Sequence, residues 1–371
     1  MDITTYPLHS ITVEEAKQLQ FRVIDIITRH FSGYEILSLG DVGLVPGLNK
    51  PLYTKKAEAV FAEVFAAEAA VFVRGAGTGA LRWAFAATVL PGDNILVHEA
   101  PIYPTTKVTM ETMGLTPVMT DFNNVESIRA VCAANKSNIK GVLIQHTRQK
   151  IDDSYNFLEV IALVKEALPD IPVITDDNYA ALKVSKIGAQ AGADLSTFSC
   201  FKILGPEGIG VILGKKKYVD MVYKYQYSGG SQVQGHEAMA ALRGLVYAPV
   251  SLAIQSEVGE ELVKRLNAGE VSGVRAAFLA NAQSKVLLVE FKEDIAEAIL
   301  EITPKLGAAA YPVGSESIYE FVPMIYRVSG TFRARDPALE KRMIRINPMR
   351  CGADTIIRIL RKAIEVLQCK D

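Results

Sequence analysis

The sequence predicts an α/β protein whose large domain holds a mainly parallel sheet with helices on both faces, followed by a smaller C-terminal α+β domain. Two observations predict this fold class. At 371 residues and 49% hydrophobic content, the chain can bury a large core and divides into about two domains. Helical patterns also alternate with short β-branched runs at 94–97, 141–144 and 171–175, an order typical of parallel sheets.

The first expected element is a helix. Residues 12–15 have the composition of a helix start, and apolar residues continue at helical spacing as far as Ile27. A loop rich in glycine and proline follows at 40–51. We expect residues 1–48 to form an N-terminal arm and helix.

The large domain is expected to span residues 49–248 and the small domain residues 249–371. The boundary is set where the alternating pattern changes, near Ala248 and Pro249. After it, the pattern predicts an amphipathic helix, a strand and a closing helix, at 252–266, 285–291 and 354–367. These elements indicate an α+β domain.

Composition favours a small-molecule partner over a polymer or a membrane. The chain has 40 Lys and Arg against 41 Asp and Glu, so its formal net charge of -1 attracts neither nucleic acid nor anionic lipid. Because no long apolar run and no secretory signal stand out, we expect a cytoplasmic location. The four cysteines form no CxxC pair and no histidine pair has metal-ligand spacing, so we expect reduced thiols and no metal.

Lys202 is the first candidate for chemistry, since it lies in the uncharged segment 195–206 among apolar and small residues. Such neighbours remove water from an ammonium group, which lowers its pKa and makes the neutral, nucleophilic amine accessible near pH 7. A lysine that bonds to an aldehyde needs this property. The alternative is an ordinary surface lysine on a turn.

Three further segments extend this candidate site. The glycine-rich segment 74–80 leads into a helical pattern, where backbone N–H groups can hold a phosphate. Tyr103 follows a strand that ends at Val97 and can lie on a planar ligand. Asp176 ends another strand, 26 positions before Lys202. Each signal alone also fits a turn, a packed tyrosine or a capping aspartate, but together they predict a pyridoxal phosphate (PLP) site in which Asp176 faces the pyridine nitrogen.

On these segments the chain resembles the fold-type I PLP-dependent enzymes of the aspartate aminotransferase superfamily, and within it the YhfS-type group of class V aminotransferase-like proteins. The resemblance extends over nearly the whole chain. It implies a mainly parallel, seven-stranded type of sheet in a three-layer α/β/α large domain. It also implies that Lys202 forms the internal aldimine and that Asp176 pairs with the pyridine nitrogen.

The resemblance assigns further residues to PLP. The phosphate would be bound by Ser199, at the serine of an S-x-x-K motif, and by Gly77, Thr78 and Gly79. Tyr103 matches the aromatic that stacks on the ring, and Tyr179 matches a position that often bonds the phenolic oxygen. Asn178 replaces the small residue usual before that tyrosine. His146 ends a strand-like run and is expected to contact the phenolic oxygen or the substrate.

Substrate binding is expected from an arginine near the C-terminus. Arg345, in the run 343–348, resembles the arginine that binds the α-carboxylate in the cystathionine-lyase branch and in many aminotransferases, because a guanidinium matches a carboxylate in two places. Asn347 stands where that branch has serine. Arg333 and Arg327 compete with Arg345 for the role.

Two segments resemble parts that reach the active site of a neighbouring subunit. Tyr53 belongs to a Tyr-x-Lys segment similar to the Tyr-x-Arg of the cystathionine-lyase branch. Gly230 and Ser231 lie in a second loop of this kind. An ordinary surface turn is the alternative for each. If either contacts PLP, the protein is a homodimer or a dimer of dimers with shared active sites.

The resemblance implies an enzyme that acts on an amino acid or a related amine, with aminotransfer as the first expectation. A β- or γ-eliminating lyase is the second, supported by the surroundings of Arg345 and the Tyr-x-Lys segment. A PLP-binding protein without turnover is the third. Intact Lys202 and Asp176 argue against that third reading, because a non-catalytic protein needs neither.

Overall fold

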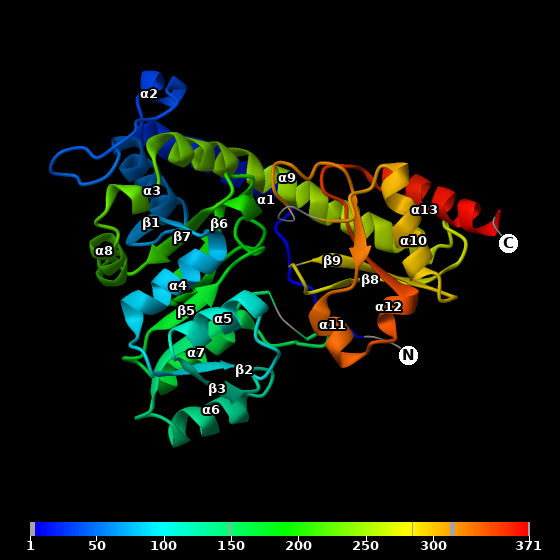
Figure 1. Cartoon of the computed structure of the whole chain (residues 1–371), viewed down its shortest axis with the longest axis horizontal. Helices are drawn as coiled ribbons and strands as arrows, with labels where there is room; N and C mark the ends of the chain where they lie inside the picture. The colour runs from blue at the N-terminus through cyan, green and yellow to red at the C-terminus, as the bar shows by residue number, and fades with distance from the viewer. Residues whose placement is uncertain (1–3, 148–149, 284, 312–315, 370–371) are drawn as a thin grey trace. The chain divides into compact units, whose positions relative to one another are not determined.

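The chain, described by a computed structural model, folds into two compact units (Figure 1). The structure describes residues 4–147, 150–283, 285–311 and 316–369. The larger unit comprises Glu15–Thr147 and Tyr155–Pro249, and the smaller unit contains the described residues of Met1–Glu14, Arg148–Ser154 and Val250–Asp371. The predicted division at residues 48 and 248 stays a prediction.

The larger unit is built on a seven-stranded sheet with the order β1-β7-β6-β5-β4-β2-β3. Its strands are β1 (Ala69–Arg74), β2 (Asn94–His98), β3 (Thr116–Thr120), β4 (Ile139–Gln145), β5 (Val173–Asp176), β6 (Leu195–Ser199) and β7 (Ile209–Gly214). Strand β7 runs antiparallel to both of its neighbours, and the other pairs are parallel. The prediction of a mainly parallel sheet in an α/β fold is confirmed.

Alternate residues of these strands point into two separate cores, which explains the apolar runs in the sequence. One core joins Leu143 and Ile174 to helices α4 (Ala76–Thr88), α5 (Pro104–Thr112) and α8 (Lys216–Tyr225). The other joins Ile144 and Val173 to α6 (Val125–Ala134) and α7 (Phe157–Ala167). The sheet is therefore the middle of three layers.

Further helices complete the larger unit. These are α1 (Val13–His30), α2 (Gly33–Leu37) and α3 (Leu52–Val64), with the 3-10 turns η1 (Gly188–Ala191), η2 (Cys200–Ile203) and η3 (Gly229–Ser231). Phe61 of α3 packs edge-on against Phe72 of β1, with ring centroids 4.9 Å apart. Helix α3 thus anchors the start of the sheet.

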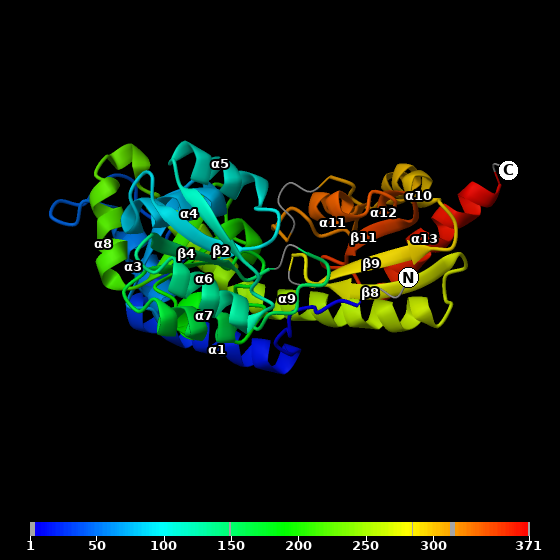
Figure 2. The same cartoon turned by 90° about the horizontal axis from the view of Figure 1, so that it is seen from below.

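The smaller unit has a four-stranded antiparallel sheet with the order β10-β11-β9-β8 (Figure 2). Its elements are β8 (Val274–Ala280), β9 (Val286–Phe291), β10 (Met324–Arg327), β11 (Met343–Asn347), α10 (Ala296–Ile302), η4 (Thr303–Leu306), α11 (Gly330–Arg335), α12 (Leu339–Arg342) and α13 (Ala353–Gln368). One face of the sheet, with Leu287 and Val289, packs on α10, α13 and the end of α9. The opposite face, with Leu288, packs on Phe332 and Leu339.

Helix α9 (Gly235–Asn267) corrects one expectation, because the pattern change near Ala248 and Pro249 does not end an element. A proline removes one backbone donor, and that loss is tolerated where apolar residues on both sides hold the helix. Leu245 and Leu252 are both fully buried. The amphipathic stretch 252–266 is therefore the second half of one long helix.

The same region includes a stretch, Gly229–Asn267, that is long and apolar enough to cross a membrane by length and composition alone. In its most apolar window, 56% is buried inside the protein. The core helix of a folded domain passes the same test, so this stretch is weak evidence for a membrane span.

Candidate functional site

Two adjacent parallel strands, β4 and β5, end side by side in polar residues, next to β6. Gln145 of β4 pairs in register with Asp176 of β5, and Asp176 pairs with Thr197 of β6. In open α/β sheets, ligands bind at this edge. The edge therefore contains the aspartate that the sequence analysis selected.

Lys202 lies on the tight turn η2, which begins directly after β6. Ser199 caps this turn, since its Oγ accepts a hydrogen bond from the Phe201 N–H at 3.2 Å. The turn ends at Leu204, whose φ of 59° is left-handed. Lys202 is partly buried, and its Nζ lies 4.3 Å from the centroid of the Tyr179 ring. The structure thus brings Lys202 and Tyr179 together.

Asp176 is partly buried at the tip of β5. Its Oδ1 accepts two hydrogen bonds from Asn178, from the backbone N at 3.1 Å and from Nδ2 at 2.8 Å. Burial raises the pKa of Asp176 above its usual range, whereas the bonds from Asn178 and Gln145 act in the opposite direction. This carboxylate has the balance of burial and hydrogen bonding often found at functional sites.

The adjacent Asp177 is fully buried and its carboxylate is held by protein groups. Its oxygens lie 2.8 Å from His146 Nδ1 and 2.6 Å from the Thr175 hydroxyl, and the Gly188 N–H also donates to them. The His146 ring stacks on Phe157, with centroids 3.6 Å apart. His146 is thus fixed from two sides, and its predicted contact with PLP stays a prediction.

The start of α4 offers unpaired backbone donors. Gly75, with a left-handed φ of 99°, caps the helix, and the N–H groups of Gly75 and Ala76 donate to the Gly208 carbonyl. Among the described residues, the N–H groups of Gly77 and Thr78 find no acceptor. Gly79 must be glycine, because a Cβ there would overlap the Arg74 carbonyl. Free N–H groups at a helix start form an anion site.

Tyr103 lies beside this helix start. It precedes α5 as its N-cap residue and is 49% exposed. The Thr78 hydroxyl lies 3.2 Å from the Thr105 hydroxyl, which links the Tyr103 loop to α4. Stacking of Tyr103 on a bound ring stays a prediction.

Tyr53 lies in the first turn of α3, and Gly230 and Ser231 lie on the turn η3. Asp41 accepts the Tyr53 N–H at 3.1 Å, and Gly235 donates its N–H to the Asp41 carbonyl at 2.9 Å. Ser231 Oγ donates to the Ser228 carbonyl at 2.7 Å on the exposed turn η3. The predicted contacts of these residues with a neighbouring subunit stay predictions.

A buried ion pair that was not predicted from the sequence joins the end of the preceding loop to α3. Lys50 Nζ lies 2.7 Å from both carboxylate oxygens of Glu58, which also accept the Phe72 N–H at 3.0 Å and the Tyr223 hydroxyl at 2.8 Å. Burial lowers the pKa of Lys50, and Glu58 opposes that shift. Lys50 and Glu58 lie eight residues apart on a loop and a helix, a spacing that sequence patterns do not distinguish from solvated charges.

The three candidate arginines lie in the smaller unit. Arg345, on the central strand β11, has its guanidinium carbon 4.0 Å from the Tyr326 ring centroid and its Nε 3.3 Å from the Arg327 carbonyl. Arg333 pairs with Glu340 at 3.1 Å. Within the described part of the chain, no carboxylate pairs with Arg345 or Arg327. Arg345 is thus supported on a ring and open to an external carboxylate.

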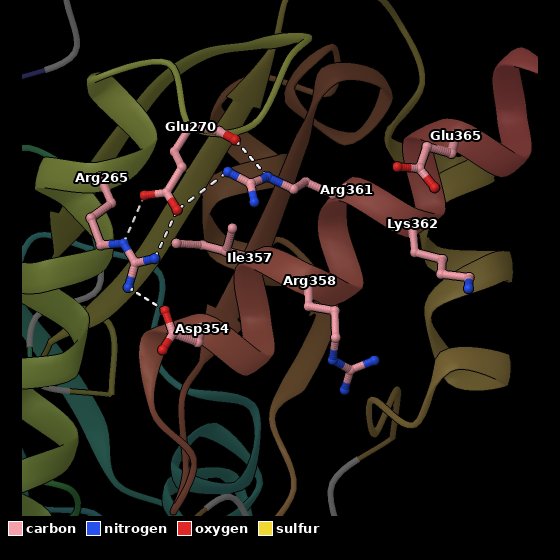
Figure 3. A pocket seen from close by; sticks show the side chains of 8 residues that line it. All are labelled: Arg265, Glu270, Asp354, Ile357, Arg358, Arg361, Lys362 and Glu365. Atoms are coloured by element: carbon pink, nitrogen blue, oxygen red, sulfur yellow. Dashed lines mark hydrogen bonds and ion pairs between the residues drawn. The ribbon is translucent and has the colours of Figure 1, made fainter.

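Two cavities lie outside the residues described so far or beside them. A surface pocket of about 290 Å³ in the smaller unit is lined by Ile357 and seven charged residues of both signs (Figure 3). There, Glu270 joins Arg265 at 2.7 Å to Arg361 at 3.3 Å. It holds none of the predicted residues. A cavity of about 20 Å³ in the larger unit is lined by His98, Gln145 and four apolar residues, next to the strand tips.

No group of three or more metal-ligating side chains occurs among the residues that the structure describes.

The contacts of Asn178 were not predicted from the sequence, where this residue stood out only as a departure from a family pattern. Asn178 Oδ1 accepts the Ser199 N–H at 2.9 Å while its Nδ2 donates to Asp176. Its position between a strand-tip aspartate and an aromatic residue is a signal that could have indicated this contact.

Comparisons with known proteins agree with this arrangement. Residues 51–244 match the Aminotransferase class-V family and residues 260–360 match the YhfS-like C-terminal domain. The chain is 50% identical to the uncharacterized protein YhfS of Escherichia coli strain K12 over 360 residues, which cover 97% of this chain and 99% of that protein.

Solved structures extend the likeness. The crystal structure of the pyridoxal-5'-phosphate-dependent protein YhfS from Escherichia coli matches with a TM-score of 0.95 over 98% of this chain and 99% of that one, at 50% identity. Cystathionine gamma synthase from Xanthomonas oryzae pv. oryzae shares the fold, with a TM-score of 0.69 at 15% identity over 95% and 98% of the two chains.

A cysteine desulfurase of Wigglesworthia glossinidia brevipalpis is 30% identical over 157 residues, covering 38% of this chain and 35% of that protein. This match is local, whereas the class-V match covers over half of the chain. The chain belongs to the class-V aminotransferase family, with a C-terminal part of the YhfS-like type.

Proposed function

We propose that this protein is a PLP-dependent enzyme that transfers the amino group of an amino acid or a related amine. The observation that carries the proposal is the position of Lys202, on a turn between the tip of β6 and β7, next to the ring of Tyr179. When bound, PLP supplies an electron sink for negative charge at the substrate Cα. The remaining chemistry belongs to this chain's side chains.

The donor set of the larger unit fits PLP. The unpaired N–H groups of Gly77 and Thr78 suit a phosphate, because they lie at a helix start where the dipole favours an anion. The Ser199 hydroxyl accepts the Phe201 N–H and keeps its own proton for a second acceptor. These groups support the assignment of a phosphate to this corner of the sheet.

Asp176 is assigned to the pyridine nitrogen and Lys202 to the covalent bond and proton transfer. An ionised Asp176 favours a protonated ring nitrogen by charge pairing. The Lys202 amine, once released by the incoming substrate, is the base that takes the proton from the substrate Cα and donates it to another carbon of the substrate–cofactor unit. The roles of Tyr103, Tyr179 and His146 remain those expected from the family.

Arg345 is assigned to the substrate carboxylate. Its guanidinium is oriented by the Tyr326 ring, and a planar guanidinium binds a carboxylate through two parallel hydrogen bonds. Arg333 is the weaker candidate, since Glu340 already occupies part of its guanidinium. This assignment predicts that the enzyme prefers amino acids to the corresponding amines.

A β- or γ-eliminating lyase acting on sulfur-substituted amino acids is the alternative. Its support is the Arg345 segment and the local likeness to a cysteine desulfurase, a protein of sulfur chemistry. The two reactions differ in their nitrogen balance. In a single turnover of the PLP-loaded protein with each of the twenty amino acids, transfer yields a keto acid without free ammonia, whereas elimination releases ammonia.

The proposal extends to assembly and location. We propose a homodimer in which Tyr53, at the start of α3, and Gly230 and Ser231, on the turn η3, reach a neighbouring active site. We place the protein in the cytoplasm, without nucleic acid or membrane as partner. Light scattering of the PLP-loaded protein tests the dimer. A measured mass equal to that of one chain would contradict an active site shared between two subunits.

A further inference from the structure

Asn178 joins three segments of the candidate site through one side-chain amide. Its Nδ2 donates to Asp176 Oδ1 at 2.8 Å, and its Oδ1 accepts the Ser199 N–H at 2.9 Å. A Cβ at Gly77 would lie 2.5 Å from the same Nδ2, so the start of α4 also approaches the amide closely. The tips of β5 and β6 and the start of α4 thus meet at Asn178.

The hydrogen bonds allow one orientation of this amide. A backbone N–H can only donate, so the group facing Ser199 must be the amide oxygen. The NH₂ group then faces Asp176, which accepts it through Oδ1. Rotation of the amide by half a turn would place two donors together at Ser199 and two acceptors together at Asp176.

Asn178 consequently controls one oxygen of the Asp176 carboxylate. Both of its donors, the backbone N and Nδ2, bind Oδ1 and leave Oδ2 without a bond from this residue. These bonds and one from the Gln145 side chain favour the charged carboxylate, whereas burial and the adjacent Asp177 carboxylate oppose it. The bonds from Asn178 also restrict rotation of the carboxylate, so that Oδ2 always faces away from Asn178.

We infer that Asn178 is a positioning residue that keeps Asp176 ionised and directs Oδ2 to the pyridine nitrogen of PLP. This inference rests on the proposed function. Asn178 acts through Asp176 and needs no contact of its own with the reacting atoms. The bond to Ser199 ties the same amide to the turn that carries Lys202, so one residue aligns the ring partner with the lysine.

The experiment uses the PLP-loaded protein with ¹⁵N in the pyridine ring and follows the ring nitrogen by NMR as the pH is raised. Asn178→Ala is the decisive variant, because it removes the side-chain donor to Asp176 and the acceptor for Ser199 without adding a charge. Asn124→Ala is the matched control, since Asn124 Oδ1 also accepts two backbone N–H groups, at the start of α6.

We expect the pH at which half of the ring nitrogen is protonated to fall by about one unit in Asn178→Ala, a tenfold change, because Asp176 loses a hydrogen bond that favours its charged form. The control should match the wild type. A purely structural role predicts weaker PLP binding in Asn178→Ala with the ring nitrogen still titrating at the wild-type pH, and that result overturns the inference alone. Wild-type protein that holds no PLP overturns the proposed function together with it.

Discussion

The ammonium group of Lys202 lies over the face of Tyr179, with Nζ 4.3 Å from the ring centroid. Lys202 follows β6 and Tyr179 follows β5, so the contact joins the tips of two adjacent parallel strands. A ring in this position stabilises the charged amine by about 0.5–2 kcal/mol. The contact holds Lys202 at the strand edge where Asp176 also lies.

Tyr179→Phe and Tyr179→Leu separate the ring of Tyr179 from its hydroxyl. Phenylalanine keeps the ring face, so we expect Lys202 to retain its reactivity with PLP while any bond from the hydroxyl to the phenolic oxygen is lost. Leucine removes the ring face as well. The rate of PLP uptake, followed by absorbance, should stay near the wild-type rate in the Phe variant and fall in the Leu variant. Equal rates in Phe and Leu variants would show that the ring contact has no effect.

Asp176→Asn should make the cofactor-free protein more stable at neutral pH. Burial raises the pKa of Asp176 above its ordinary value of 3.8, so the folded chain holds this proton to a higher pH than the unfolded chain does. The protonated carboxyl group therefore contributes stability below pH 3.8, and this contribution is lost as the pH rises through the raised pKa. Urea unfolding from pH 8 downward should show the gain of the variant shrink toward pH 4.

The same variant should be impaired in chemistry. Without the charge of Asp176, exchange of the substrate Cα proton with solvent should slow by roughly 10²-fold, the scale of losing one electrostatic partner in a closed site. Mass spectrometry of amino acids incubated in deuterium oxide measures this exchange. An unchanged exchange rate would remove Asp176 from its assigned role.

Asp177→Ala should act on stability instead. The carboxylate of Asp177 is buried and satisfies His146, Thr175 and the Gly188 N–H, so its removal leaves these groups unpaired. We expect a loss of about 3 kcal/mol in the free energy of unfolding. Asp220→Ala, which breaks the exposed pair with Lys216, should cost about 0.5 kcal/mol and serves as the control. Equal losses in both variants would contradict this distinction.

Arg345→Ala should raise KM for amino acids about tenfold to a hundredfold, because a charge-assisted bond contributes roughly 1.5–3 kcal/mol. It should leave KM for the corresponding decarboxylated amines unchanged. Arg333→Ala and Arg327→Ala are matched controls with smaller expected effects. Steady-state kinetics on both substrate sets provide the measurement. A larger effect of Arg333→Ala on KM would show that Arg333, and not Arg345, binds the substrate carboxylate.

The sequence predicted the layers of the fold and the residues of the strand edge, for identifiable reasons. Runs such as 141–144 are apolar on both faces, which only a covered sheet requires, and strand ends such as Asp176 stand out by their charge. The continuity of α9 through Pro249 was missed, because burial of Leu245 and Leu252 outweighs one lost backbone bond.

Other features arise only from tertiary contacts. Asn178 meets Ser199 and Gly77 because two strand tips and a helix start converge, and the sequence separates these residues widely. The assignment of the substrate carboxylate to Arg345 instead of Arg333 depends on Glu340 of α12, which pairs with Arg333 of α11. Pairing of this kind cannot be read from residue types.

The central claim is the covalent bond between PLP and Lys202, and borohydride reduction of the PLP-loaded protein followed by peptide mapping tests it most directly. Lys183 is an informative competitor, since its Nζ lies 5.9 Å from the same Tyr179 ring. We predict a single pyridoxyl label, on Lys202, which disappears in Lys202→Ala and persists in Lys217→Ala. A label on Lys183, or none on the wild-type protein, would contradict the account.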